Sequence, residues 1–293
     1  MTPFELVEPA SLREAIGALD ADDPSTRAIA GGTALMLMMK IGIFRPTRLV
    51  SLRRIEERYR HIDLDEDGAL HIGALVPLAV LERSPVVAAR APVVTAALLT
   101  LSNVRVRNVA TVGGHLAHAD PHMDLPPVLI ALGARVFVVG PSGERWIDVV
   151  DLFKGYYETS LANDELIAEL VIPAQGKRCA AYLKCTTLSA DDWPAVGVAV
   201  SIETDGDAIK EAKVALSAAT EKAVRLDAVA EYLRGKRGDE ATCKQAGEAA
   251  ADAVNVLADG RGSVEYKKQL VRVYTARAIA RAFDAATRGG ASV

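Results

Sequence analysis

Two stretches decide the fold of this chain: residues 30–40 read AGGTALMLMMK, and residues 108–134 read NVATVGGHLAHADPHMDLPPVLIALGA. In the first, a short apolar run over residues 28–30 stops at a pair of glycines and gives way to a helical pattern over residues 34–40. The second carries another Gly-Gly pair at residues 113–114. The pattern therefore predicts a strand, a tight glycine turn and a helix, followed later by a second glycine turn in the same domain.

The sequence around these turns alternates between short strand patterns and helical patterns. We expect helices over 11–19, 78–101 (broken near Pro85 and Pro92) and 126–132, strands over 47–52, 134–139 and 167–172, and a hairpin over 62–75 turning at Asp67-Gly68. Ser11 and Glu14 have the spacing of a capping box at the start of the first helix. This portion is predicted to be α+β.

The composition changes after a Gly/Pro/basic stretch at residues 173–178. Three strands are predicted beyond it, over 181–188, 195–203 and 209–216, and then three helices over 226–234, 242–257 and 265–286. We therefore divide the chain into two domains, 1–176 and 177–293. The second is expected to be a three-stranded antiparallel sheet with helices.

Composition excludes several functional classes. The 293 residues carry a net charge of -4, so no bulk positive field favours nucleic acid as the main partner. Three cysteines without a C-x-x-C pair favour neither a disulfide framework nor an iron–sulfur site in this chain. The N-terminus lacks the pattern of a secretory signal, and no apolar run is long enough for a transmembrane segment. We expect a cytoplasmic protein, with docking onto a membrane partner left open.

The two glycine turns have a possible chemical role. A glycine turn that opens a helix can direct backbone N–H groups at an anion, because no side chain blocks close approach. Neither turn matches the P-loop or the Rossmann fingerprint, so no specific nucleotide is indicated. An ordinary tight turn remains the simpler interpretation of each alone. Two such turns in one domain favour a dinucleotide, whose diphosphate needs donors on both sides.

The segment at residues 115–124 contains three histidines and two aspartates. Three interpretations are open. A metal site is one, although the spacing lacks a helical H-E-x-x-H register. A polar loop in which Asp124 caps the following helix is another. In the third, Asp124 accepts hydrogen bonds from a ribose or adenine while His115 and His118 hydrogen-bond a cofactor.

The four segments AGGTALMLMMK (30–40), NVATVGGHLAHADPHMDLPPVLIALGA (108–134), DDWPAVGVAV (191–200) and SVEYKKQLVRVYTARAIARAF (263–283) together resemble the FAD-binding medium subunit of molybdenum hydroxylases. This is the family of the flavoproteins of aerobic carbon monoxide dehydrogenase and xanthine dehydrogenase. The resemblance implies an FAD-binding domain of the PCMH/VAO type, followed by the C-terminal domain of the carbon monoxide dehydrogenase flavoprotein.

The resemblance also implies the cofactor-binding residues. The first turn would bind the diphosphate with Ala30, Gly31, Gly32, Thr33, Ala34 and Leu35. Thr111, Gly114 and His115 would form the second clamp, with His118 nearby. Both histidines replace side chains that are often Asn, Asp or Thr in the family. Asp124 would bind the nucleotide end, and Ile167 would lie beside the cofactor.

Three residues of the second domain complete the implied site. Lys184 would lie near the flavin, and Asp192 and Trp193, with Asp191 before them, would bring this domain over the isoalloxazine. From the residues alone, Lys184 is equally well a solvated charge on an edge strand, and Trp193 a core residue. No catalytic side chain and no metal ligand is assigned in this chain.

The implied function is electron transfer. FAD in this chain would accept electrons from iron–sulfur clusters of a small subunit, which are reduced by the molybdenum cofactor of a large subunit, and would pass them to an external acceptor. The assembly would be a dimer of heterotrimers. Two alternatives remain open: a free-standing FAD-dependent oxidase or dehydrogenase of the VAO type, and a nucleotide-binding module without a redox role.

Overall fold

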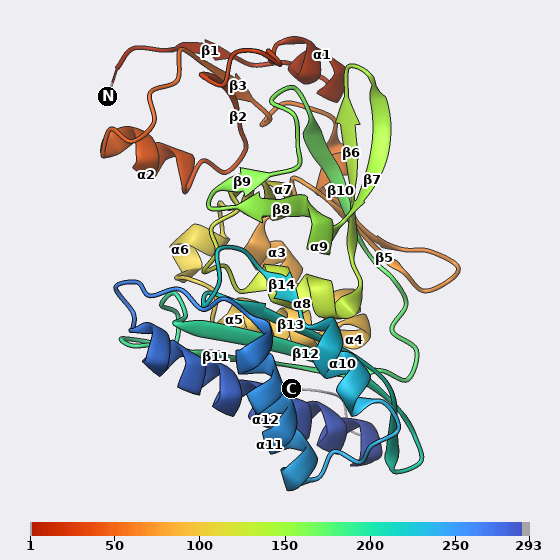
Figure 1. Cartoon of the computed structure of the whole chain (residues 1–293). Coiled ribbons are helices and arrows are strands. Elements are labelled where there is room, and N and C mark those ends of the chain that lie inside the picture. The colour runs from red at the N-terminus through yellow and green to blue at the C-terminus, as the bar shows by residue number, and fades with distance from the viewer. Residues whose placement is uncertain (1, 289–293) are drawn as a thin grey trace.

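The computed structural model describes residues 2–288, and its first layer is a small parallel sheet. β1 (Glu5–Val7) and β2 (Thr26–Ile29) pair in parallel on either side of β3 (Arg48–Ser51). Parallel strands need crossover connections, and α1 (Leu12–Gly17) and α2 (Leu35–Lys40) supply them (Figure 1). The turn between β2 and α2 is the first glycine turn, as predicted.

The predicted cap of the first helix is present. The Ser11 hydroxyl accepts a hydrogen bond from the Glu14 amide at 3.2 Å, and the Glu14 carboxylate accepts one from the Ala10 amide at 2.9 Å. The helix ends at Gly17, two residues before the predicted end.

The second layer is a five-stranded sheet with neighbouring strands in the order β4-β5-β10-β6-β7. Its strands are β4 (Ile62–Leu64), β5 (Leu70–Gly73), β6 (Arg135–Gly140), β7 (Gly143–Asp148) and β10 (Leu166–Ile172). All four pairings are antiparallel, and the predicted hairpin is β4 with β5. β7 was not predicted.

A helical layer connects β5 to β6. Its helices are α3 (Leu78–Arg83), α4 (Pro85–Arg90), α5 (Pro92–Leu99), α6 (Val104–Arg107), α7 (Val112–His118) and α8 (Leu125–Leu132). Smaller elements are the 3-10 helix η1 (Glu57–Arg60), α9 (Val149–Leu152), and the paired β8 (Phe153–Gly155) and β9 (Glu158–Thr159). Pro85 and Pro92 each begin a helix, so the predicted helical breaks are confirmed. Every residue of α8 is buried.

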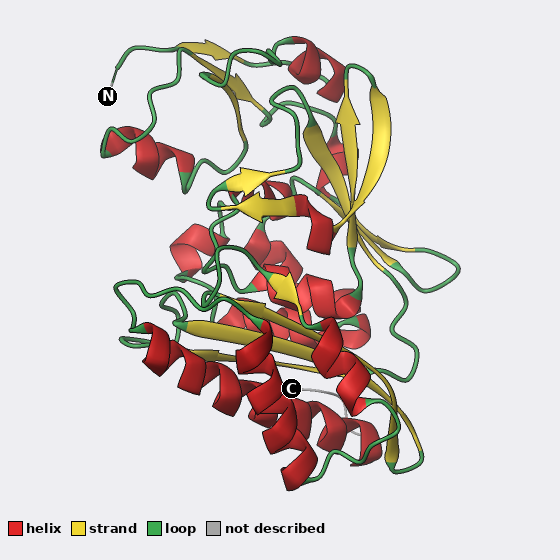
Figure 2. Cartoon of the chain, in the orientation of Figure 1, coloured by secondary structure: helices red, strands yellow, loops and turns green. Residues whose placement is uncertain are grey.

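The C-terminal part contains the predicted three long antiparallel strands with a short fourth strand at one edge. The order is β11 (Cys179–Cys185), β12 (Val196–Asp205), β13 (Ala208–Ser217) and β14 (Val224–Arg225). Three helices follow: α10 (Asp227–Leu233), α11 (Glu240–Ala253) and α12 (Val264–Arg288). They cover the outer face of the sheet (Figure 2).

Residue alternation explains why this sheet is covered on both faces. Val198, Val200 and Leu216 belong to the apolar cluster shared with α11 and α12. The intervening Ala199 and Ala215 belong to the cluster that contains α8. Successive side chains of a strand point to opposite faces, and the small alanines allow α8 to approach closely. The loop before α8 is therefore placed directly against the C-terminal sheet. The division at residue 176 falls between β10 and β11 and stays a prediction.

Candidate functional site

The two glycine motifs, far apart in sequence, meet in space. A Cβ on Gly31 would collide with the carbonyl oxygen of Val109 and lie 2.9 Å from the Ala110 Cα, so only glycine fits there. On the other side, a Cβ on Gly114 would lie 3.7 Å from the Ala30 Cβ. The turn before α2 and the start of α7 therefore form the two walls of one cradle.

The first wall presents free backbone donors. Gly32 has a φ of +70°, a conformation that favours glycine. The amides of Gly32, Thr33 and Ala34 have no hydrogen-bond acceptor among residues 2–288. Ala34 precedes α2 without a side-chain cap, and Leu35 is the first helical residue. These groups are available to an anionic ligand.

The second wall corrects the sequence prediction. Residues 112–114 are the first turn of helix α7 rather than a glycine turn, because the Thr111 hydroxyl caps the helix by accepting from the Gly114 amide at 3.2 Å. Gly113 packs against Ala74, and its amide donates to the Ala74 carbonyl at 2.8 Å. Gly114 is exposed beside the first wall.

His115 contains an unsatisfied polar atom at this wall. Its Nε2 is fully buried, although the residue as a whole is half-buried, and it has no hydrogen-bond partner among the described residues. Burial lowers the pKa of His115 to about 4, so the ring is neutral near pH 7. Burial also lowers the pKa of His118, whose ring centre lies 5.2 Å from that of Tyr157.

Asp124 does not cap α8, contrary to the polar-loop interpretation. Its backbone is already helical, and its side chain turns toward the C-terminal sheet instead. There it accepts from the Tyr182 hydroxyl at 2.6 Å and lies 3.2 Å from the Lys184 Nζ. Burial raises the pKa of Asp124 to about 6, even though Lys184 and Tyr182 act to lower it. Tyr182 was not predicted, since nothing in the sequence connects it to Asp124.

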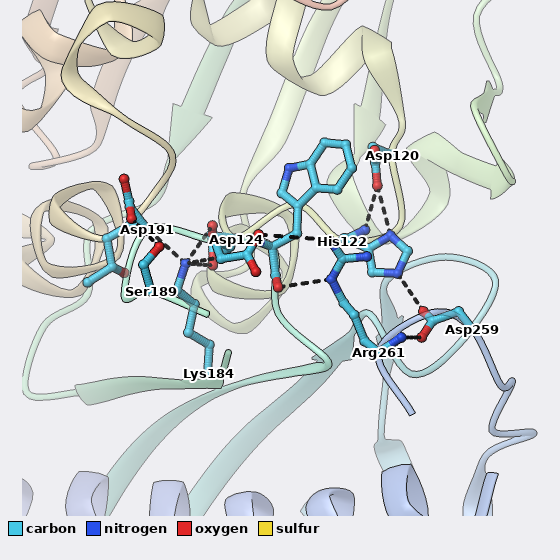
Figure 3. Close-up of polar contacts among 11 residues, drawn as sticks. Asp120, His122, Asp124, Lys184, Ser189, Asp191, Asp259 and Arg261 are labelled. Atoms are coloured by element: carbon cyan, nitrogen blue, oxygen red, sulfur yellow. Dashed lines mark hydrogen bonds and ion pairs between the residues drawn. The ribbon is translucent and has the colours of Figure 1, made fainter. Parts of the chain in front are cut away.

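The Lys184 side chain is only 7% exposed, so the alternative of a solvated edge charge is wrong. Its ammonium group donates to the carbonyl oxygens of Thr100 at 2.7 Å and Asp192 at 3.0 Å, in addition to its contact with Asp124. An ammonium group has three N–H donors, and these three partners occupy them all. Lys184 therefore joins the residue after α5, the loop before α8 and the segment that leads to Trp193. Figure 3 shows its side chain directed at Asp124.

The remaining predicted residues lie in two places. Ile167 is buried on β10, in the same apolar cluster as Val112 and Leu116 of α7. Trp193 is 46% exposed and is not a core residue. Its amide donates to the Asp192 carboxylate at 2.8 Å. The structure thus brings the Asp124–Lys184 pair close to Asp192, whereas Ile167 belongs to the core behind α7.

The described residues offer neither a metal-binding cluster nor a membrane-spanning helix. Within residues 2–288, no three or more His, Cys, Asp or Glu side chains converge in a way that could hold a metal ion. Over the same range, each helix is too short or too polar to cross a membrane.

Comparison with known families identifies the architecture. Residues 2–175 match the model of the FAD binding domain in molybdopterin dehydrogenase, and residues 181–282 match that of the CO dehydrogenase flavoprotein C-terminal domain. The chain belongs to this family. It is an FAD-binding medium subunit of the molybdenum hydroxylase type and hence part of an oxidoreductase.

Relatives in this family align over nearly the whole chain. The carbon monoxide dehydrogenase medium chain of Hydrogenophaga pseudoflava is 31% identical over 94% of this chain and 96% of its own. The nicotine 6-hydroxylase medium subunit of Paenarthrobacter nicotinovorans is 33% identical over 94% of this chain and 95% of its own. Among solved structures, quinoline 2-oxidoreductase from Pseudomonas putida 86 superposes with a TM-score of 0.91 at 30% identity, covering 98% of this chain and 99% of that one.

Proposed function

We propose that this chain is the electron-transfer subunit of a molybdenum hydroxylase complex. It accepts electrons from iron–sulfur clusters of a small partner subunit, which are reduced at the molybdenum cofactor of a large subunit, and passes them to an external acceptor. Bound FAD supplies the redox chemistry that no side chain here provides. The family membership supports this assignment.

The cradle between the two glycine motifs fits the diphosphate of FAD. Three amides of the first wall lack acceptors among the described residues, and glycine at position 31 lets this turn pack directly against the Val109 carbonyl, which brings the two walls together. The unpaired His115 Nε2 is the observation that carries the proposal, because a buried polar atom without a partner is costly unless a ligand completes it. As a neutral ring it can donate or accept there.

The residues beyond the cradle hold the rest of the cofactor in this proposal. Thr111 fixes the second wall, and Asp124, held by Tyr182 and Lys184, lies at the nucleotide end. Lys184 acts by its charge and by fixing the segment that ends at Trp193, since its donors are already occupied. Trp193 excludes water from the isoalloxazine, and Ile167 supports the wall from behind.

The proposal extends to the assembly. We place the chain in a dimer of heterotrimers in the cytoplasm, with any contact to the membrane made through partners. Residues 1–176 and 177–293 are its two domains. Purification of the chain from its native host, followed by mass spectrometry and a native molecular-mass measurement, tests the partners and their number.

A pair of leucine substitutions tests the diphosphate site. A leucine at position 32 would press on Ile29 and Met36 and shift the turn that carries the free amides. Gly42→Leu is the control for backbone strain, because Gly42 has a φ of +79° and only an Arg45 side-chain nitrogen within 4 Å. Both substitutions carry similar backbone strain. We expect Gly32→Leu to weaken FAD binding about 100-fold, which corresponds to the loss of two charge-assisted hydrogen bonds. The control should bind FAD normally. Flavin absorbance of the purified complex measures the content.

The outcomes separate the alternatives. Equal flavin content in both variants, with both folded, rejects the diphosphate assignment. Oxidation of a substrate by the isolated chain favours the free-standing oxidase. A chain that never takes up flavin, alone or with its partners, favours a module without a redox role.

A further inference from the structure

His122 lies between two carboxylates that come from different halves of the chain. Its Nδ1 is 3.1 Å from an Asp120 oxygen, and its Nε2 is 2.8 Å from an Asp259 oxygen (Figure 3). The His122 amide also donates to Asp120 at 2.8 Å. The Asp120 side chain is 2% exposed and that of His122 is 15% exposed, so bulk water does not compete strongly for these contacts.

These two contacts hold the His122 ring from both sides. Each ring nitrogen of an imidazole can take part in a hydrogen bond, so one ring can join two carboxylates. The ring therefore connects the loop before α8 to the segment before α12.

Asp259 is held ionised on its side of the ring. Its carboxylate also accepts from the Lys267 Nζ at 2.6 Å and from the Arg261 amide at 2.8 Å. Burial acts to raise its pKa, but the hydrogen bonds from Lys267 and His122 outweigh burial and lower the pKa to about 2. Lys267, on α12, is 1% exposed and donates as well to the Ala218 carbonyl.

Asp120 is ionised on the other side. Burial acts to raise its pKa, and the hydrogen bonds from His122 reverse the direction and lower it. The Tyr157 hydroxyl donates to its second oxygen at 3.1 Å, and His118 lies beside the Tyr157 ring. No further acceptor or cation from these elements contacts the His122 ring among the described residues.

The Trp193 indole lies against this ionic cluster. The His122 and Trp193 rings are 6.2 Å apart between centroids and inclined by 20°, an offset stack. The Arg261 Cζ lies 5.3 Å from the Trp193 ring centroid, and the Arg261 Nε donates to the Trp193 carbonyl at 3.1 Å. Arg261 also approaches the Asp192 carboxylate, at 3.9 Å.

We propose that His122 and Arg261 are positioning residues that form a clamp and hold the Trp193 indole at the edge of the flavin site. Arg261 holds the Trp193 backbone through the hydrogen bond to its carbonyl, and its guanidinium group contacts the indole ring. His122 supplies the stacked contact, and its two carboxylate partners tie the FAD-binding part of the chain to the C-terminal part. The position of the clamp relative to flavin rests on the proposed function, whereas the clamp itself does not.

The chain offers a direct optical test, since it has two tryptophans. Trp146→Phe leaves Trp193 as the sole indole reporter. Acrylamide quenching of its fluorescence is measured in the full, flavin-free chain, with and without His122→Gln. The control is His61→Gln, because His61 is exposed and lies outside the cluster.

We expect His122→Gln to raise the quenching constant of the Trp146→Phe chain. Trp193 is 46% exposed, so its release would about double the constant. Glutamine can replace one ring donor but not the stacked ring itself. His61→Gln should leave the constant unchanged.

The same quenching constant in the parent and in a folded His122→Gln variant would overturn the clamp. Circular dichroism confirms that each variant is folded. The link to flavin is read separately, in FAD-loaded complex, as a quenching of flavin fluorescence by Trp193 that His122→Gln reduces. A clamp present in the flavin-free chain without that link would contradict the placement at the flavin while leaving the clamp intact.

Discussion

At the scale of single residues, burial shifts two titratable groups of the site toward their neutral forms. The pKa of His115 falls to about 4, so the folded chain binds its proton more weakly than the unfolded chain does. The pKa of Asp124 rises to about 6, so the folded chain binds that proton more tightly. As pH falls toward 4, His115 therefore destabilises the fold while Asp124 stabilises it. Only the difference in unfolding free energy between two variants isolates the effect of either group.

Replacing His115 with glutamine isolates its effect. Between its folded pKa of about 4 and its unfolded value of 6.5, the stability that a neutral His115 contributes is lost as pH falls. We expect the unmodified, flavin-free chain to lose about 2 kcal/mol more than His115→Gln between pH 7 and pH 5. Urea unfolding at the two pH values measures it. Equal losses in both chains would contradict the assignment, and the exposed His61→Gln should behave as the unmodified chain.

At the scale of elements, α7 depends on the absence of a side chain at Gly113. A Cβ there would lie 2.6 Å from the Ala74 Cβ and 3.1 Å from the Ala74 carbonyl oxygen. Ala74 follows β5, so this contact sets how closely α7 approaches the five-stranded sheet. Helix propensity alone would favour alanine at such a position by about 1 kcal/mol.

Two glycine-to-alanine substitutions separate propensity from packing. Gly17 ends α1 with nothing within 4 Å of its Cβ position, so Gly17→Ala should raise the unfolding free energy by up to about 1 kcal/mol. Gly113→Ala should lower it by about 1–3 kcal/mol, because overpacking exceeds the propensity gain. Thermal unfolding compares them. A stabilised Gly113→Ala would show that α7 can shift away from β5 freely.

Elements with strong periodicity could be predicted from the sequence, and weakly patterned ones could not. The long strands of the C-terminal sheet and helix α12 carry clear apolar spacing, and their predictions are confirmed within a few residues. β7 reads GERWID, with one buried residue at the edge of its sheet, so it lacks a recognisable apolar face. The start of α7 was mistaken for a turn because glycine usually signals one.

Such patterns could not predict contacts between residues that are far apart in the sequence. Capping of α8 by Asp124 was one of three interpretations of its segment, because acidic residues do so at helix starts, yet Tyr182 and Lys184 hold its carboxylate. The contact between His122 and Asp259 joins residues 137 positions apart. The segment at 115–124 could be recognised as unusual, but its partners come from tertiary packing.

At the scale of the whole molecule, one apolar cluster crosses the predicted domain division. Ala180, Ala199 and Ala215 from the C-terminal sheet, with Ala223 just before β14, pack into the same cluster as the helical layer. Buried apolar surface shared in this way couples the unfolding of the two parts.

We therefore expect the flavin-free chain to unfold in a single cooperative transition. Differential scanning calorimetry should give equal calorimetric and van't Hoff enthalpies. Two resolved transitions would instead indicate that the parts on either side of residue 176 are stable independently. A reference scan of Gly17→Ala should shift the whole transition rather than one component.

The pairing of Asp124 with Tyr182 and Lys184 limits how chimeras of related medium subunits can be made. A crossover near residue 176 takes the acid from one parent and its phenol and ammonium partners from the other. If the second parent lacks them, the hybrid contains a buried carboxylate without its partners. Such a defect typically destabilises a protein by several kcal/mol. Exchanges that move these three positions together avoid that defect wherever the splice is made.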